Sequence, residues 1–316
     1  MGLFPKSLSR YFALAGIPLS KGSKVFIVDA VNGSDSNTGL TFEDPLLTVA
    51  AAYALCTTLH NDVVLLVGNG TSYSGAALTW GKDFTHLIGL NSGGPEPRSR
   101  IKCTAALATT PFVTVSGDGC IIRNISFWHE TSNAAGLVNV LVSGSRNTFE
   151  GCQFAGGVGS NAVTGARSLQ VGFAGEGSGN TFRNCWIGCD TIAQVDGQAG
   201  VEFVSGAMHT LFEDCVFATE TVGTTYAHVT AAAAAGVGRA NIFKRCLFIQ
   251  EGAGTLATVV LLGAALPASS YIYMIDCWQL GAADWDHNNR GVITNVTIAA
   301  NTTGVNTGNK LVITSG

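Results

Sequence analysis

The densest group of side chains that could carry chemistry lies at residues 284 to 290, which read DWDHNNR. Asp284, Asp286 and His287 could hold a metal ion or a sugar, His287 could act as a general base, and Trp285 could supply an aromatic platform. The same run, which ends in Arg290, suits equally well a solvated turn or ion pairs to a neighbouring subunit. A glycan contact through Asp284, Trp285, Asp286, His287 and Arg290 is therefore a hypothesis.

Acidic residues elsewhere do not form an obvious catalytic set. Cleavage of a polysaccharide needs paired carboxylates at a defined separation, or acidic Ca²⁺ ligands with a basic residue. The acids of the repeated part of the chain are few and scattered: Glu150, Asp190, Glu202, Glu213, Asp214 and Asp276. Only Glu213, Asp214 and Asp276 come near one another on a plausible face. The sequence therefore predicts no catalytic residue and a protein that is not an enzyme.

Cysteines are the other candidate ligands. There are nine, and an odd number argues against a closed disulfide framework. Five recur at spacings of 33, 30, 31 and 31 residues: Cys152, Cys185, Cys215, Cys246 and Cys277. Ligands strung along a line do not close a tetrahedron, so we expect reduced, inward-facing thiols and no zinc site. A Ca²⁺ loop at Asp35, Asn37 and Glu43 fails the EF-hand spacing, because Leu40 replaces the required glycine. No metal or cofactor is predicted.

The five cysteines belong to a phrase that the chain repeats. It reads NTFEGCQF at 147 to 154, NTFRNCWI at 180 to 187, TLFEDCVF at 210 to 217 and NIFKRCLF at 241 to 248, with a weaker copy at 273 to 279. A period of this length indicates a solenoid. Short alternating runs that end in glycine precede the copies, such as VNVLVSG at 138 to 144 and VEFVSG at 201 to 206. Several short strands per repeat predict an all-β, parallel β-helix.

Strand alternation assigns each repeat position to the inside or the outside. The cysteines and the phenylalanines around them point inward. The residue after each inward position points outward and forms a column: Ser126, Gln153, Trp186, Val216, Leu247 and Trp278. Four of these six are apolar, which is unusual for a column that faces water, and the alanine run at 231 to 235 is equally small and apolar. Either a loop of the same chain covers this column, or copies of the chain meet there.

Composition and charge limit the partners. Charged residues make up 12% of the chain, yet no apolar run approaches the ~20 residues that span a bilayer. The formal charge of −4 divides into +4 for residues 1 to 24 and −8 for the rest. No basic stripe runs along the repeats, which argues against nucleic-acid binding.

Three regions are expected along the chain. Residues 1–23 form an extended arm, which is either a disordered tail or a docking arm; its contact residues would be Leu3, Phe4, Arg10, Tyr11 and Phe12. Ala13-Leu14-Ala15 has the form of a signal-peptide cleavage site, but the apolar run before it is short. Residues 24–61 form a cap with a short alanine-rich helix after Pro45 and Thr48. Residues 62–316 form the β-helix, in about eight coils of ~30 residues.

The cap and the first coils resemble a known superfamily. The segments that carry the resemblance are VDAVNGSDSNTG at 28 to 39, DVVLLV at 62 to 67, GTSY at 70 to 73 and LIGL at 87 to 90. They are similar to the opening of right-handed parallel β-helix proteins of the pectate-lyase-like superfamily. That superfamily includes polysaccharide lyases and hydrolases, phage tailspikes and virion surface proteins, so the fold does not select a function.

The sequence-based prediction of function follows from the arm and from the outward column. The resemblance to phage proteins favours a structural virion protein, assembled in the host cytoplasm and located on the virion surface. In this role it would be a trimeric capsid cement or decoration protein, bound to the major capsid protein or another virion protein through its arm. The homotrimer interface would contain Trp186, Val216, Leu247, Trp278, Ala232 and Ala234.

Two alternatives stay open. The first is a tailspike or carbohydrate-active β-helix that recognises or cleaves surface glycan, with Trp128 and Trp285 as stacking residues. The second is a secreted β-helix adhesin that is cleaved near Ala15.

Overall fold

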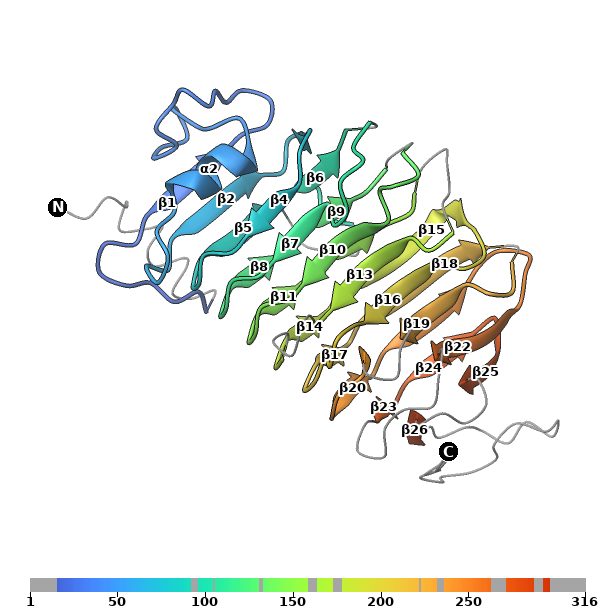
Figure 1. The fold of residues 1–316 in the computed structure, drawn as a ribbon. Coiled ribbons are helices and arrows are strands. Elements are labelled where there is room, and N and C mark those ends of the chain that lie inside the picture. The colour runs from blue at the N-terminus through green and yellow to red at the C-terminus, as the bar shows by residue number, and fades with distance from the viewer. Residues whose placement is uncertain are drawn as a thin grey trace.

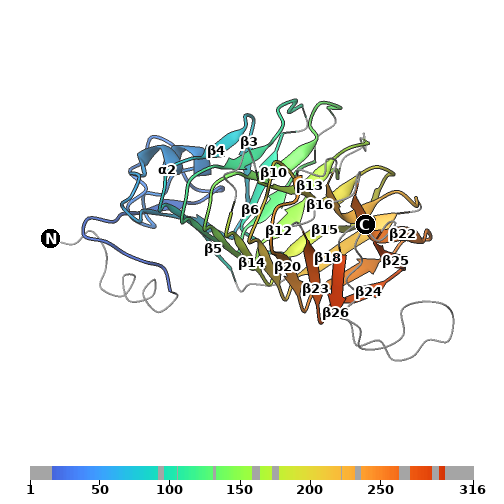
Figure 2. The same cartoon turned by 60° about the horizontal axis from the view of Figure 1, so that its bottom comes forward.

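The structure, a computed structural model, describes residues 16–91, 96–104, 106–130, 133–158, 164–172, 178–221, 223–231, 236–262, 271–286 and 292–295. Its strands stack in three parallel sheets that wind around one core (Figure 1, Figure 2). The all-β parallel β-helix with an N-terminal capping helix is thus confirmed. In the described part of the chain, no helix is long and apolar enough to cross a bilayer.

The three sheets share one order, in which each strand pairs in parallel with the equivalent strand of the next rung. Sheet A contains β1 (Val25–Val28), β2 (Val63–Val67), β5 (His86–Leu90), β8 (Ile121–Arg123), β11 (Thr148–Glu150), β14 (Thr181–Arg183), β17 (Leu211–Glu213), β20 (Asn241–Lys244), β23 (Ile272–Ile275) and β26 (Val292–Asn295). Sheet B contains β3 (Thr71–Ser74), β6 (Arg100–Cys103), β9 (Ser126–Trp128), β12 (Gln153–Ala155), β15 (Trp186–Gln194), β18 (Val216–Thr221), β21 (Leu247–Gln250) and β24 (Trp278–Leu280). Sheet C contains β4 (Leu78–Trp80), β7 (Val113–Val115), β10 (Val138–Val142), β13 (Arg167–Val171), β16 (Ala199–Phe203), β19 (Ala227–Ala231), β22 (Leu256–Leu262) and β25 (Ala282–Asp286).

A tight corner joins sheet A to sheet B and accounts for the repeated phrase. The corner residue has a φ between 50° and 60° in six rungs: Asn124, Gly151, Asn184, Asp214, Arg245 and Asp276. This left-handed conformation turns the chain without a loop. The next residue then enters the core, and in five rungs it is a cysteine. Those five thiols each donate to a carbonyl of the preceding rung; for example, Cys277 Sγ lies 3.3 Å from Phe243 O.

The cysteines are thus reduced and inward, as predicted. All nine are buried and free of disulfides. Burial raises the pKa of the Cys185 thiol well above its ordinary value, which keeps it protonated at neutral pH.

Phenylalanine stacks fill the core beside the thiols. The rings of Phe149, Phe182, Phe212 and Phe243 follow one another at centroid distances of 4.6 to 4.7 Å and are nearly parallel. A second stack joins Phe217 to Phe248 at 4.6 Å. Equal inward positions in successive parallel strands place equal side chains one above another. The predicted inward phenylalanine columns are confirmed.

The cap closes the N-terminal end of the core. Helix α2 (Val49–Leu55) is held at its start by Thr48, whose Oγ1 accepts from Ala51 N at 3.1 Å. Asp35 accepts from the backbone N of Leu47 and of Thr48 and from the Thr48 hydroxyl. Both oxygens of Asp35 are therefore used to fix the helix.

Lys82 ties the other end of this helix to the first coil. Its Nζ donates to the carbonyl oxygens of Tyr53, Ala54 and Cys56 at 2.7 to 3.0 Å and lies 4.9 Å from the Tyr53 ring centroid.

We expect Lys82→Met, which keeps the aliphatic stem, to lower the free energy of unfolding by about 2–3 kcal/mol, since three carbonyls lose a charged donor. Urea unfolding measures this. Lys21→Met, in an exposed residue, should change it by less than ~0.5 kcal/mol.

The last residues of the predicted arm and the first strand of the cap pack on the coils. Strand β1 of the cap pairs with β2 and so begins sheet A. Ile17, which belongs to the predicted arm, is 2% exposed and packs on the outer face of this sheet against Val25, Val63 and Ile88. The predicted docking residues Leu3, Phe4, Arg10, Tyr11 and Phe12 lie outside the described residues.

The outward column of sheet B exists in the predicted register, but its burial changes along the axis. Ser126 and Gln153 are fully buried, and Gln153 Nε2 lies 3.4 Å from Glu96 Oε1 of a preceding loop. Intrachain cover therefore accounts for this end of the column. Trp186 and Val216 are half-buried, while Leu247 and Trp278 are exposed. Ala232 and Ala234 lie outside the described residues, so the subunit interface stays a prediction.

Candidate functional site

A sheltered carboxylate on the outer face of sheet C is the strongest candidate for chemistry. Glu202 in β16 stands beside Gln170 in β13, because the two strands pair Gln170 with Glu202. Gln170 Nε2 donates to Glu202 Oε2 at 2.5 Å, and Arg167 Nε lies 3.4 Å from the same oxygen. The side chains of Arg167 and Glu202 are only 15% and 9% exposed. In the next strand of sheet C, β19, Thr230 pairs with Glu202.

Burial makes this group unusual for an outward position. Burying an ion pair costs desolvation free energy that is about as large as the Coulombic attraction between the two charges. Such a pair therefore contributes little to stability. A sheltered ion pair on the outer face is therefore a candidate for function rather than for stability. Both contacts fall on Oε2, so neither of them uses Oε1. The Gln170 amide and the Arg167 guanidinium supply further donors for an anionic or carbonyl oxygen.

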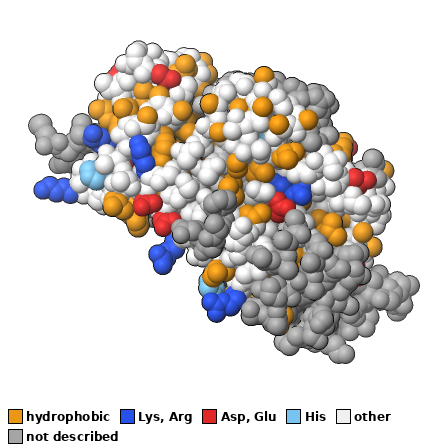
Figure 3. Space-filling view, in the orientation of Figure 1, with side chains coloured by type: hydrophobic (Ala, Val, Ile, Leu, Met, Phe, Trp, Pro, Cys, Tyr) orange, Lys and Arg blue, Asp and Glu red, His pale blue; other side chains and the backbone are white. Residues whose placement is uncertain are grey.

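Charged side chains on this face are few, and basic and acidic atoms adjoin near its centre (Figure 3). No group of three or more His, Cys, Asp or Glu within the described ranges is arranged to hold a metal ion. Glu202, Gln170 and Arg167, the carboxylate trio, supply a carboxylate, an amide and a guanidinium.

A second polar feature, the charge ladder, follows the outer face of sheet A. It consists of Arg123, Glu150, Arg183, Glu213 and Lys244, one per rung, with Asp214 and Arg245 at the adjoining corner. Glu213 accepts from Arg183, Lys244 and Arg245 at 3.0 to 3.2 Å, and these bonds lower its pKa to about 2. Glu213 is therefore ionised at neutral pH and is not a general acid.

The glycan contact predicted at residues 284 to 290 is not the surface loop that was expected. Ala282–Asp286 forms strand β25 of sheet C, in which Ala282 pairs with Leu256 and Asp284 with Thr258. This register places Trp285 in the core, 7% exposed and edge-on to Phe248 at 5.9 Å. Its ring is not available to a sugar, whereas Asp284 is exposed. The Asp286 side chain, His287 and Arg290 lie outside the described part.

The other stacking residue proposed for a glycan is also covered. Trp128 is 8% exposed, and its ring lies under the Arg100 guanidinium at 4.7 Å. Its Nε1 donates to Glu130, which pairs with Lys102 at 2.7 Å. Asp35, considered above as a Ca²⁺ ligand, uses both carboxylate oxygens to accept hydrogen bonds from Leu47 and Thr48 at the start of helix α2.

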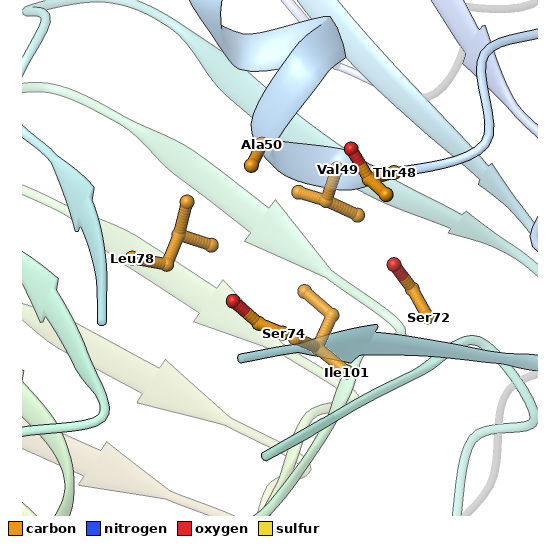
Figure 4. A pocket seen from close by; sticks show the side chains of 7 residues that line it. All are labelled: Thr48, Val49, Ala50, Ser72, Ser74, Leu78 and Ile101. Atoms are coloured by element: carbon orange, nitrogen blue, oxygen red, sulfur yellow. The ribbon is translucent and has the colours of Figure 1, made fainter. Parts of the chain in front are cut away.

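A small pocket lies where helix α2 meets the first coil (Figure 4). It is lined by Thr48, Val49, Ala50, Ser72, Ser74, Leu78 and Ile101 and has a volume of ≈ 10 Å³. This is about the space of one water molecule, too small for a sugar.

The carboxylate trio on sheet C was missed from the sequence, where Glu202 counted as one of several scattered acids. The strands of sheet C contain no recurring residue, comparable to the cysteine after the corner, that would show how successive strands align. Aligning SLQVG and VEFVSG by their glycines pairs Gln170 with Val204, two residues out of register. Aligning them by their inward residues, Leu169 with Val201 and Val171 with Phe203, gives the observed pairing of Gln170 with Glu202.

Solved structures share this fold, although no family model matches the chain and no curated protein matches it either. Pectin methylesterase PemA from Erwinia chrysanthemi is similar over 90% of this chain and 92% of its own, with a TM-score of 0.58 and 12% identity. Pectate lyase Pel9A is similar over 90% of this chain and 81% of its own, with a TM-score of 0.56 and 15% identity. ORF18 of Geobacillus virus E2 matches at a TM-score of only 0.48 with half of its length covered, too low to carry an argument. At these identities the likeness shows the fold, a parallel β-helix similar to those of pectin methylesterases and pectate lyase.

This finding corrects one prediction. The chain was expected not to be an enzyme, but the solved structures that share its fold over nine tenths of the chain are enzymes, pectin methylesterases and a pectate lyase. The shared fold gives no support to capsid attachment. It agrees better with the alternative of a carbohydrate-active β-helix.

Proposed function

We propose that this chain is a carbohydrate-active β-helix that acts on a polyuronate-type polysaccharide at the outer face of sheet C. The observation that carries the proposal is the sheltered trio of Glu202, Gln170 and Arg167. The neighbours supply the substrate class, since pectin and pectate are polymers of uronic acid. The reaction that the trio fits best is hydrolysis of an ester on such a polymer.

The roles follow from the contacts. Glu202 Oε1 accepts a proton from water, and the resulting hydroxide adds to the ester carbonyl. The Gln170 amide donates to the oxyanion that forms, and the proton returns to the departing alcohol. Arg167, 3.4 Å from Oε2, orients the carboxylate. Water and ester are consumed, and acid and alcohol are released.

Turnover of esterified and unesterified polygalacturonate by the whole chain tests this. We expect alcohol release from the esterified polymer, and a loss of about 100-fold or more in Glu202→Gln, which keeps the side-chain shape and the contact to Gln170. The matched control is Glu150→Gln in sheet A, which also breaks one ion pair but should leave turnover unchanged. Equal activity of Glu202→Gln and the native chain, or no turnover of either polymer, would contradict the proposal.

The virion role remains a separate prediction. A trimeric cement protein would need the arm at residues 1–23 and a subunit interface. Sedimentation of the purified chain, with and without these residues, measures the oligomer. Attachment to a virion particle measures the docking.

A further inference from the structure

Sheet A changes its hydrogen bonding at the seam between β5 and β8 (Figure 1). In six rungs, the first paired residue donates its backbone N–H to the carbonyl that lies one residue before its partner; for example, Thr148 N donates to Cys120 O at 2.9 Å. This bond, at 2.8 to 2.9 Å, is made by Val63, His86, Thr148, Thr181, Leu211 and Ile242. Ile121, the equivalent residue of β8, donates instead to Nδ1 of the His86 ring at 3.1 Å.

The carbonyl that would complete the ladder has another partner. Because Leu87 pairs with Ile122, the equivalent acceptor for Ile121 is Thr85 O. That oxygen accepts from Trp80 Nε1 at 3.3 Å. At this seam an imidazole nitrogen therefore takes the place that a main-chain oxygen has in those six rungs.

The two hydrogen bonds of the His86 ring determine where its proton lies. Nδ1 accepts from an N–H and so carries no proton, and Nε2 therefore donates its own proton to Asn61 Oδ1 at 3.1 Å. The residue is fully buried, and Asn61 belongs to the loop that joins helix α2 to β2. A proton added to Nδ1 would face the N–H of Ile121, and the acceptor of this bond would be lost.

The charged groups around the ring do not hold it in the protonated form. Burial lowers the pKa of His86 to about 4, and the negative charge of Asp62, which precedes β2, opposes only part of this effect. On the β8 side, burial raises the pKa of Cys120 to about 11, so this thiol is uncharged. Asp83 and Asp118 act on Cys120 and lie in the segments that precede β5 and β8. His86 is therefore neutral, and its bond to β8 intact, at pH 7.

We propose that His86 is a proton-operated latch in sheet A: a proton on Nδ1 breaks the bond to Ile121, and the seam between β5 and β8 opens while the coils from β11 onward stay folded. The cap moves with β5, since the β1–β2 and β2–β5 ladders use main-chain carbonyls and Lys82 holds helix α2 to the first coil. This inference does not depend on the proposed function.

The direction and size of the effect follow from the two states of the ring. In the open seam the pKa of His86 returns to ~6.5, whereas in the closed seam it is about 4. The closed state is therefore favoured above pH 6.5 and loses stability as the pH falls toward 4. The equilibrium constant for opening should grow about 20-fold between pH 7 and pH 5.

Cys120 can report this opening, because it is fully buried and its Sγ donates across the seam to Lys82 O at 3.6 Å. The protection factor of a thiol is its rate of alkylation in urea divided by its rate in the folded chain at the same pH. We expect the protection of Cys120 to fall about 20-fold from pH 7 to pH 5 and to lie at least ~10-fold below that of Cys152, one rung further on. His86→Asn, whose Oδ1 stands where Nδ1 was and does not titrate, should remove most of this pH dependence. The matched control is His228→Phe, which removes another buried histidine and should keep it.

Equal protection factors for Cys120 and Cys152 at every pH would overturn the latch, because the molecule would then open as a whole. The same fall in the protection of Cys120 in His86→Asn as in the native chain would also overturn it, because another group would carry the titration. Hydrogen exchange of the native chain needs no variant. At pH 5, Ile121 N–H should be at least ~10-fold less protected than Thr148 N–H, which donates to a carbonyl. Equal protection of these two amides contradicts the proposal.

Discussion

Replacing Phe212 with alanine is expected to lower the free energy of unfolding by about 3–5 kcal/mol, the usual cost of removing a buried phenyl ring. The ring is fully buried and stacks between Phe182 and Phe243 at 4.6 and 4.7 Å. Edges of Phe203 and Phe217 close its other sides at 6.4 and 5.7 Å. Rungs on both sides are rigid sheets, so they cannot collapse into the space that the ring leaves.

Urea unfolding followed by far-UV circular dichroism measures this loss. In a solenoid each repeat depends on its neighbours, so weakening one rung uncouples the two halves of the stack. We therefore expect a broader transition as well as a lower midpoint. Phe42→Ala, on the exposed surface of the cap, is the control and should change the free energy by less than ~0.5 kcal/mol. A loss below ~1 kcal/mol in Phe212→Ala would show that the stack is not a main source of stability.

The second large effect is a loss of stability in mild acid. Burial lowers the pKa of His86 and of His129 to about 4 and that of His228 to about 3. In the unfolded chain all three return to ~6.5. Between pH 6.5 and about 4 the unfolded state therefore binds more protons than the folded state, and stability falls as the pH is lowered. Each histidine contributes up to ~1.4 kcal/mol per pH unit within its window.

His228→Phe isolates one of these contributions. Neither ring nitrogen of His228 has a hydrogen-bond partner, and the ring lies 5.7 Å from both Tyr226 and Phe248. Phenylalanine can keep these ring contacts without a titrating group. We expect the variant to be at least as stable as the native chain at pH 7. The difference between their free energies of unfolding should grow by about 1 kcal/mol per pH unit as the pH falls from 6.5 to 4. Parallel pH profiles of the two chains would contradict this account.

The fold could be predicted because the sequence marks the same place in five successive rungs, from Cys152 to Cys277. A left-handed corner residue and a cysteine mark all five, and a phenylalanine three positions before the cysteine marks four of them. The burial of Ser126 and Gln153 could not be predicted in this way. It comes from a loop that contains Glu96, and no periodicity reports where a loop of one rung lies over another.

Function was harder to predict, because it depends on how the strands pair and on which side chains face the core. Trp285 was expected at the surface because it lies among polar residues, but pairing with β22 turns it into the core. Glu202 was discounted because its partners are more than 30 residues away and adjoin it only through the pairing of β13 with β16. Pairwise strand register, rather than local composition, was the missing information.

The buried thiols of the nine cysteines can report where and when the molecule unfolds locally. They are spread from Cys56 under the capping helix to Cys277 near the other end of the stack, and a thiol in the main core does not react until its own coil separates from the next. Pulse alkylation followed by peptide mass analysis would therefore record which coil opens first and how far the opening travels. Five of the thiols, from Cys152 to Cys277, recur every 30 to 33 residues, so no label has to be introduced.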